Sequence, residues 1–119
     1  MKNQSFHKRL AFAGRGVSVA LRSERSLRAQ AVVFIAVLAL LAAIRPEPQW
    51  WAIILLACGS VFVAELANTA LEAIADRLHP ELDPLIEKAK DCAAGAVLLA
   101  SLTAIGVGIA FAAHCLTAR

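Results

Sequence analysis

A run of acidic and amide side chains, ELANTALEAIAD, spans residues 65–76 of an otherwise strongly hydrophobic chain. Its polar members are Glu65, Asn68, Glu72 and Asp76. They follow one another at spacings of three, four and four residues, so on an α-helix they share one face. A carboxylate at membrane depth costs several kcal/mol unless it is paired, hydrated or bound to a cation. The stripe therefore indicates either a cation and phosphate site at the membrane boundary or a polar seam that joins helices through hydrogen bonds.

Phosphoryl transfer from ATP to a lipid hydroxyl is a reaction that such side chains suit. Mg²⁺ typically binds one or two protein carboxylates plus phosphate oxygens, and in-line transfer needs little beyond metal, charge neutralisation and a positioned base. Glu24 and Glu72 are candidate metal ligands, and Lys90 is a candidate for neutralising phosphate charge. Glu65, the acid furthest into the lipid, is the candidate general base for the alcohol. The sequence has no G-x-x-x-x-G-K-[ST] loop and no Gly-rich loop of the protein-kinase kind, so neither common nucleotide fold is expected.

The composition is that of a membrane protein with a single domain, residues 1–119. Hydrophobic residues make up 60% of the chain, and the mean hydropathy of +0.68 lies far above that of a soluble domain. The three cysteines are expected to be small apolar side chains and not disulfides or metal ligands. Seven of the twelve Lys and Arg residues precede Ala29, alongside one acid. This bias indicates an anionic membrane surface and excludes nucleic acid as the expected partner.

Four helices are expected to position these residues. Over residues 4–22 apolar side chains recur at helical spacing and basic ones fall on another face, which predicts an amphipathic helix lying on the membrane. Residues 24–44, 50–78 and 84–115 are predicted to cross the bilayer. The first of these spans is long enough only if Arg28 snorkels its guanidinium to the headgroups. Ser23 is a candidate N-cap for it.

Prolines predict where the helices end. Residues 45–49, RPEPQ, are expected to form a tight turn, and both tryptophans follow it at once, where an aromatic belt belongs. In the charged connection 76–90, Pro80 stops the second span, and Asp83 followed by Pro84 caps the third. The basic N-terminal segment places the N-terminus and this connection in the cytoplasm. The charged groups of all three spans are therefore expected to meet at the cytoplasmic face of the membrane.

Three segments together resemble the family of prokaryotic diacylglycerol kinases and undecaprenol kinases. They are SERSLRAQ before the first span, ELANTALEAIADR in the second and AKDCAAGAV in the third. The family pattern is E-x-x-N-[ST]-A-[IL]-E-x-x-x-D followed by A-K-D, and the likeness covers nearly the whole chain in order and spacing. It implies a small homotrimeric kinase of the bacterial inner membrane. Each subunit would have three transmembrane helices and an N-terminal surface helix, and neighbouring subunits would share active sites at the cytoplasmic face.

The resemblance also implies roles for the polar residues of the first two spans. Glu65 matches the family's catalytic base, and Asn68 matches its site amide, which helps to position the substrate. Glu24 and Glu72 match its metal carboxylates, and through the Mg²⁺ they belong to the ATP site. Asp76 is expected to be a helix-end or loop-anchoring residue.

Nucleotide contacts are implied for a second group of residues. Lys90 and Asp91 match the family's ATP-contacting pair, although residue types alone would also allow a solvated helix start. Glu81 and Asp83 fall where the family's loop approaches the nucleotide, whereas the pattern alone favours a surface charge and an N-cap. Phe12 lies where the family often has an aromatic residue near the adenine.

The acceptor lipid stays open between diacylglycerol and undecaprenol, or both. NTALE and AKDxAAGAV resemble the undecaprenol branch, because the other branch usually has NSAIE and a serine in place of Ala94. Gln30 stands where the undecaprenol branch often has His, which favours diacylglycerol. Arg28 and Ala94 are the expected positioning residues for the lipid, beside Glu65 and Asn68.

A non-enzymatic membrane assembly or cation-binding module is the alternative function. Small residues repeat every four positions along the third span and would let another helix approach closely. They are Ala96, Ala100, Ala104, Gly108 and Ala112. Lys90 with Asp91 discriminates between the two functions, because a helix seam needs no cation at its rim whereas a phosphate site does.

Overall fold

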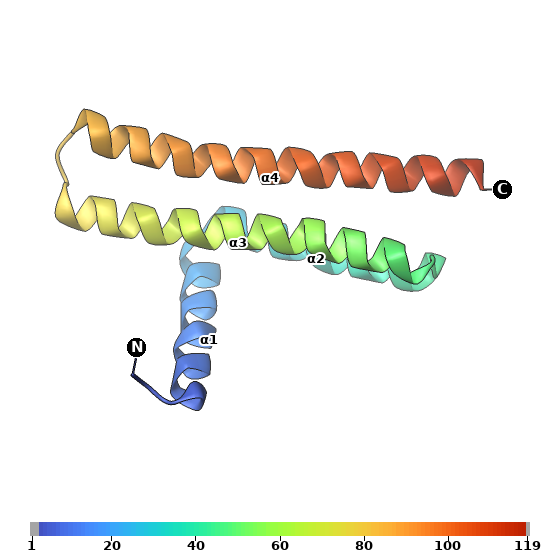
Figure 1. The fold of residues 1–119 in the computed structure, drawn as a ribbon, viewed down its shortest axis with the longest axis horizontal. Coiled ribbons are helices and arrows are strands. Elements are labelled where there is room, and N and C mark those ends of the chain that lie inside the picture. Colours follow the sequence, from blue (N-terminus) through green and yellow to red (C-terminus); the bar gives the residue numbers. More distant parts are fainter. Residues whose placement is uncertain (1–2, 119) are drawn as a thin grey trace.

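The computed structural model describes residues 3–118 as four α-helices joined by short connections (Figure 1). They are α1 (Phe6–Ser23), α2 (Arg25–Ile44), α3 (Pro48–Leu78) and α4 (Pro84–Thr117). α2, α3 and α4 are each long and apolar enough to cross a membrane. The expected all-α fold with three candidate spans is therefore confirmed, and the helix ends differ from the expected ones by at most two residues.

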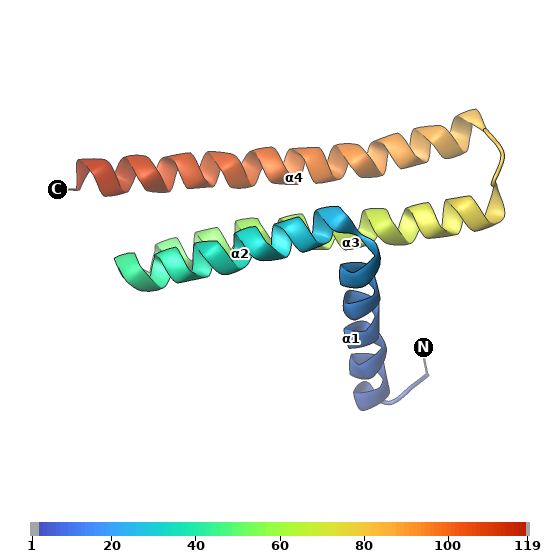
Figure 2. The ribbon, with the colours of Figure 1, turned by 180° about the vertical axis from the view of Figure 1, so that it is seen from behind.

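α1 stands apart from the other three helices. It runs across their common direction and meets them near its C-terminal end, as both views show (Figures 1 and 2). Ala20, close to that end, is buried. At the other end the Ser5 side chain caps the helix by accepting a hydrogen bond from the Lys8 N–H at 3.4 Å. The placement of α1 on a membrane surface stays a prediction.

Glu24, and not Ser23, is the residue at which α1 gives way to α2. Ser23 is the last residue of α1, and its hydroxyl donates to the Ala20 carbonyl at 3.5 Å. The expectation that Ser23 caps α2 is therefore wrong. Glu24 has an extended backbone, φ −109° and ψ 113°, and its side chain makes no capping hydrogen bond. The chain thus turns at one residue, and the Glu24 carboxylate does not bond the first N–H groups of α2.

The two remaining connections form where the prolines predict them. Arg45 adopts the left-handed conformation, with φ 55°, directly before Pro46, and α3 then starts at Pro48. At the other end of the bundle, Oδ1 of Asp83 accepts hydrogen bonds from two backbone N–H groups, at 2.8 and 3.3 Å, and Pro84 follows as the first helical residue. The N-cap interpretation of Asp83 is confirmed. A proline fits there because the first helical position has no N–H to satisfy.

α3 is the helix on which both other spans pack. Its contacts with α4 run along most of its length, and α2 lies along another side of it (Figures 1 and 2). Near the α2–α3 turn, Leu41, Ile54 and Phe111 form a buried cluster with one residue from each helix. The Trp50 ring lies 5.1 Å from the Phe111 ring and 5.2 Å from the His114 ring, measured between centroids. Trp50 therefore packs α3 against α4 and is half-buried.

Leu41→Ala should lower the free energy of unfolding by about 2 kcal/mol, because the lost side chain leaves a cavity among well-packed neighbours. Leu41 is 0% exposed, whereas the adjacent Leu40 is 53% exposed and gives a matched control. Leu40→Ala should stay within about 0.5 kcal/mol of the parent chain. Unfolding by dodecyl sulfate in mixed micelles measures both variants, and equal losses would contradict the proposed core.

Candidate active site

Glu65 is the one buried charged side chain among residues 3–118, at 6% exposure. Its Oε2 accepts a hydrogen bond from the Ser26 hydroxyl at 3.1 Å. Because Ser26 lies in the first turn of α2, this bond ties the start of α2 to the middle of α3. A single neutral hydrogen bond compensates a buried carboxylate only in part. The carboxylate is thus held in place and can still accept a further hydrogen bond.

Asn68 and Glu72 continue the polar face of α3. The Asn68 amide nitrogen lies 3.5 Å from Oε1 of Glu72, to which it donates. Oδ1 of Asn68 is buried and has no hydrogen-bond partner within the described chain. A buried acceptor without a partner costs about 1–3 kcal/mol, so a ligand or cation that satisfied it would be favoured.

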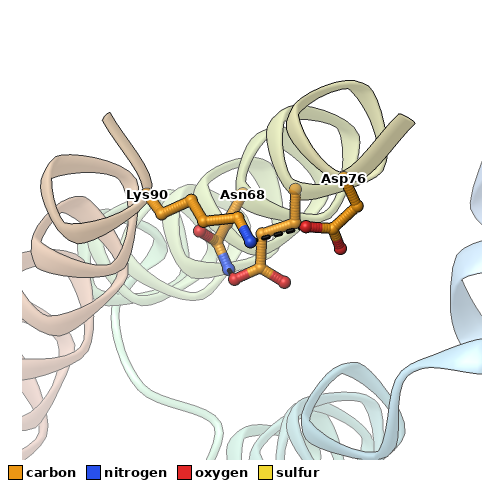
Figure 3. A network of polar contacts seen from close by, with 4 residues as sticks. Asn68, Asp76 and Lys90 are labelled. Atoms are coloured by element: carbon orange, nitrogen blue, oxygen red, sulfur yellow. Dashed lines mark hydrogen bonds and ion pairs between the residues drawn. The ribbon is translucent and has the colours of Figure 1, made fainter. Parts of the chain in front are cut away.

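An ion pair between α3 and α4 closes the outer end of this face (Figure 3). Nζ of Lys90 lies 2.5 Å from Oδ1 of Asp76, and the side chains are 35% and 66% exposed respectively. Figure 3 shows the Lys90 ammonium reaching across toward the polar stripe of α3 that includes Asn68. Asp76 was expected to anchor the helix end or the loop, and its ion pair with Lys90 joins the two helices across that loop. Lys90 is accordingly held at the site and does not extend freely into solvent.

Glu24 and Arg28 lie at the junction of α1 and α2. The Glu24 side chain is half-buried, and it makes no ion pair with any residue in the range 3–118. One guanidinium nitrogen of Arg28 donates to the carbonyls of Leu21 and Arg22, at 3.0 and 2.7 Å. Arg28 thus satisfies the last carbonyls of α1, which helix geometry leaves without partners. Its expected contact with lipid headgroups stays a prediction.

The remaining candidate residues are exposed or serve the local backbone. Asp83 is the N-cap of α4, and Glu81 is exposed in the connection before it. Asp91 and Ala94 are exposed on α4. Phe12 is partly exposed on α1, where the guanidinium of Arg15 lies 5.6 Å from its ring centroid. The roles of these residues toward ATP and lipid stay predictions.

The donor atoms of the site suit Mg²⁺, although the described chain does not assemble a full ligand set by itself. Within residues 3–118 no three His, Cys, Asp or Glu side chains cluster closely enough to hold a metal ion. Mg²⁺ usually takes only one or two carboxylates from protein and keeps phosphate oxygens and water as its other ligands. The Glu72 carboxylate, the unpartnered Oδ1 of Asn68 and the uncommitted Glu24 carboxylate are all oxygen donors of this kind.

The structure therefore groups the predicted residues in two places. In one place Asp76 pairs with Lys90 and Asn68 bonds its neighbour Glu72. In the other, Glu65, one helical turn before Asn68 on α3, accepts a hydrogen bond from Ser26. Sequence reasoning noticed Ser26 only as a residue in the first turn of its helix. No periodicity or motif connects it with Glu65, because the two residues are 39 positions apart and meet only through packing.

Comparison with known families accounts for this arrangement. The family model of the prokaryotic diacylglycerol kinases matches residues 11–112, a range that includes all the candidate site residues. The chain belongs to the prokaryotic diacylglycerol kinase family. As a member it is an enzyme, a lipid kinase, and this excludes a purely non-enzymatic assembly module.

Two relatives carry different substrate names. The chain is 36% identical over 104 residues to an undecaprenol kinase of Bacillus subtilis (strain 168), an alignment that covers 87% of this lipid kinase and 85% of the relative. It is 38% identical over 98 residues to a diacylglycerol kinase of Synechocystis sp. (strain ATCC 27184 / PCC 6803 / Kazusa). The second alignment covers 82% of this chain but only 56% of that relative's length. Family membership and three apolar helices together indicate a bacterial membrane protein.

Ser26→Ala should lower kcat about two- to tenfold, because the lost hydrogen bond, worth about 0.5–1.5 kcal/mol, no longer orients Glu65. KM for the nucleotide should not change, and Ser26→Thr should restore most of the rate. Ser60→Ala is the matched control, since that hydroxyl bonds only the Leu56 carbonyl of its own helix. A Ser26→Ala rate equal to the control's would remove Ser26 from the site.

Proposed function

We propose that this lipid kinase transfers the γ-phosphoryl group of ATP, with Mg²⁺, to the hydroxyl of diacylglycerol or undecaprenol at the cytoplasmic membrane face. The observation that carries the proposal is a buried Glu65 on the same helix face as a polar network that contains a cation, Lys90. A base in a water-poor site beside a phosphate-binding edge is what phosphorylation of a lipid alcohol needs.

Glu65 is the base in this proposal. Its carboxylate accepts the proton of the lipid hydroxyl while the lipid oxygen bonds to the γ-phosphorus, and the bond from that phosphorus to the ADP oxygen breaks. The Ser26 hydroxyl fixes the orientation of the carboxylate from α2. Because Glu65 lies about 16 Å along the helix from Asp76, the lipid hydroxyl enters at the deeper end of the stripe and the nucleotide at its outer end.

The outer end of the stripe binds ATP. Glu24 and Glu72 would hold the Mg²⁺, which would supply positive charge to neutralise the phosphate oxygens. Lys90 adds a positive charge that is already positioned by Asp76. Asn68 uses its unpartnered Oδ1 to accept a hydrogen bond from a donor group beside the phosphates or to bind the metal ion. Further contacts to the nucleotide are proposed for four residues around this end: Phe12, Glu81, Asp83 and Asp91.

Topology and assembly complete the proposal. The excess of basic residues before Ala29 places the N-terminus in the cytoplasm of the bacterial inner membrane, in a multi-pass arrangement. Large apolar side chains on all three candidate spans are exposed in the single chain, among them Val32, Leu56 and Leu99 at 66–73%. They would face lipid or neighbouring subunits of a homotrimer. An active site shared between subunits is consistent with a Glu24 carboxylate that forms no ion pair within residues 3–118 of its own chain.

The acceptor is a lipid alcohol in both alternatives, since one relative is named for undecaprenol and the other for diacylglycerol. Arg28 and Ala94 are the residues proposed to position the acceptor lipid and so to affect which lipid is phosphorylated. Arg28 would act at the level of the headgroups, and Ala94 would act from α4. Both lipids present a neutral hydroxyl on a hydrophobic body. The chemistry at Glu65 is therefore the same for either.

A direct assay tests the reaction and the base together. Purified chain in mixed micelles, supplied with labelled ATP, Mg²⁺ and both lipids in parallel, should label at least one lipid alcohol. Glu65→Gln should lower kcat by at least about 10²-fold, within the range for loss of a general base. Glu87→Gln, an exposed acid in the first turn of α4, should retain the parent rate. Full activity in Glu65→Gln would refute the base assignment, and no labelled lipid with either substrate would refute the reaction.

Asp76→Asn should raise KM for ATP about two- to fivefold, because an exposed ion pair of up to about 1 kcal/mol no longer holds the Lys90 ammonium. The kcat should change less than KM, since Asp76 does not touch the reacting atoms. Asp76→Glu keeps the charge and should restore part of the affinity. Steady-state kinetics at varied ATP separate these effects, and an unchanged KM in Asp76→Asn would show that the ion pair plays no part in nucleotide binding.

A further inference from the structure

Two adjoining hollows lie at the end of the bundle opposite the candidate active site. An apolar hollow of about 400 Å³ runs between α2, α3 and α4. It exists because α2 and α4 both pack on α3, while among residues 3–118 no Cα atom of α2 comes within 8 Å of one in α4. Figure 2 shows these two helices on different sides of α3. A volume of this size lies within the range of sites for small hydrophobic ligands.

A second hollow of about 360 Å³, the outer hollow, lies beside the apolar one at the α2–α3 turn, and its wall mixes apolar and charged side chains. The two hollows share Ile44, Phe111 and Cys115 in their walls, so they adjoin, and together they are called the groove. The walls of the outer hollow also include Arg45 and Glu47. Both side chains are exposed, and neither forms an ion pair in the described part of the chain. The groove thus ends beside two opposite charges that form no ion pair within residues 3–118.

We infer that this groove binds a zwitterionic aminophospholipid, with a hydrocarbon chain in the apolar hollow and the headgroup in the outer hollow beside Arg45 and Glu47. A guanidinium is well matched to a phosphate, and a carboxylate to a primary ammonium. An anionic phospholipid would satisfy Arg45 but would be repelled by Glu47. Charge complementarity therefore selects a headgroup that carries both signs.

The groove is separate from the acceptor-lipid site of the kinase. Glu47 lies about 27 Å along α3 from Glu65 by helical rise, which places the two near opposite membrane surfaces. Diacylglycerol and undecaprenol also carry no charge that Arg45 or Glu47 would recognise. The bound phospholipid is then a structural ligand that fills the space between α2 and α4, and the inference holds whichever lipid alcohol is phosphorylated.

Tryptophan fluorescence gives a readout that does not depend on catalysis. The chain has two tryptophans, Trp50 and Trp51, and Trp50 packs against the groove residue Phe111. In micelles of a nonionic detergent, phosphatidylethanolamine with brominated chains should quench this emission at a concentration about two- to fivefold lower than brominated phosphatidylglycerol, the factor that one exposed ion pair supplies.

Charge-removing variants test the site. Glu47→Gln and Arg45→Gln should each abolish the preference for phosphatidylethanolamine. Glu47→Gln removes no helix cap, because the Glu47 side chain makes no capping bond. Glu87→Gln and Lys88→Gln, exposed at the other end of the bundle, are the matched controls and should keep the preference. Equal quenching of the parent chain by the two lipids would overturn the inference, and so would the absence of quenching by either lipid.

Discussion

A carboxylate held inside an apolar bundle by one hydroxyl is the constraint on which the site depends. The Ser26 hydroxyl, which reaches Glu65 from α2, offsets part of the cost of burying this carboxylate to 6% exposure. Ser26 reaches it because the chain turns at Glu24 and starts α2 immediately afterwards. Arg28 then binds the last carbonyls of α1 and keeps that turn closed. The orientation of α1, and with it the position of the Glu24 carboxylate, is thereby coupled to the buried Glu65 carboxylate.

The connection between α3 and α4 controls the other half of the site. His79 ends α3, Pro80 prevents its continuation, and Asp83 starts α4 after a short loop. The two helices therefore run antiparallel from the loop, and residues on either side of it face one another. Asp76 and Lys90, 14 positions apart, meet for this reason. A longer or more flexible loop would lose the ion pair, because a surface pair of this kind contributes at most about 1 kcal/mol and cannot hold helices together unaided.

Sequence patterns predicted the helices well and the contacts between them poorly. Prolines, caps and hydropathy act within one or two turns, so they placed the helix ends and the N-cap at Asp83. The bond from Ser26 to Glu65 depends instead on how α2 and α3 are rotated about their axes, which no local pattern encodes. The same holds for the ion pair of Asp76 with Lys90, because the loop-anchoring role expected for Asp76 did not name its partner. Ser23 was mistaken for a cap because the break came one residue later than the serine.

The unused polar atoms distinguish a binding site from a helix seam. A seam is most stable when each buried polar atom has a partner, and a half-satisfied network is less stable than an apolar contact. Within residues 3–118 the carboxylate of Glu65 has Ser26 and Asp76 has Lys90, yet Oδ1 of Asn68 has none. Within residues 3–118, folding thus leaves an acceptor open at the middle of the stripe, between the buried Glu65 carboxylate and the Lys90 ammonium. Polar atoms left open at that place favour the binding of a ligand there, because the ligand recovers what folding did not.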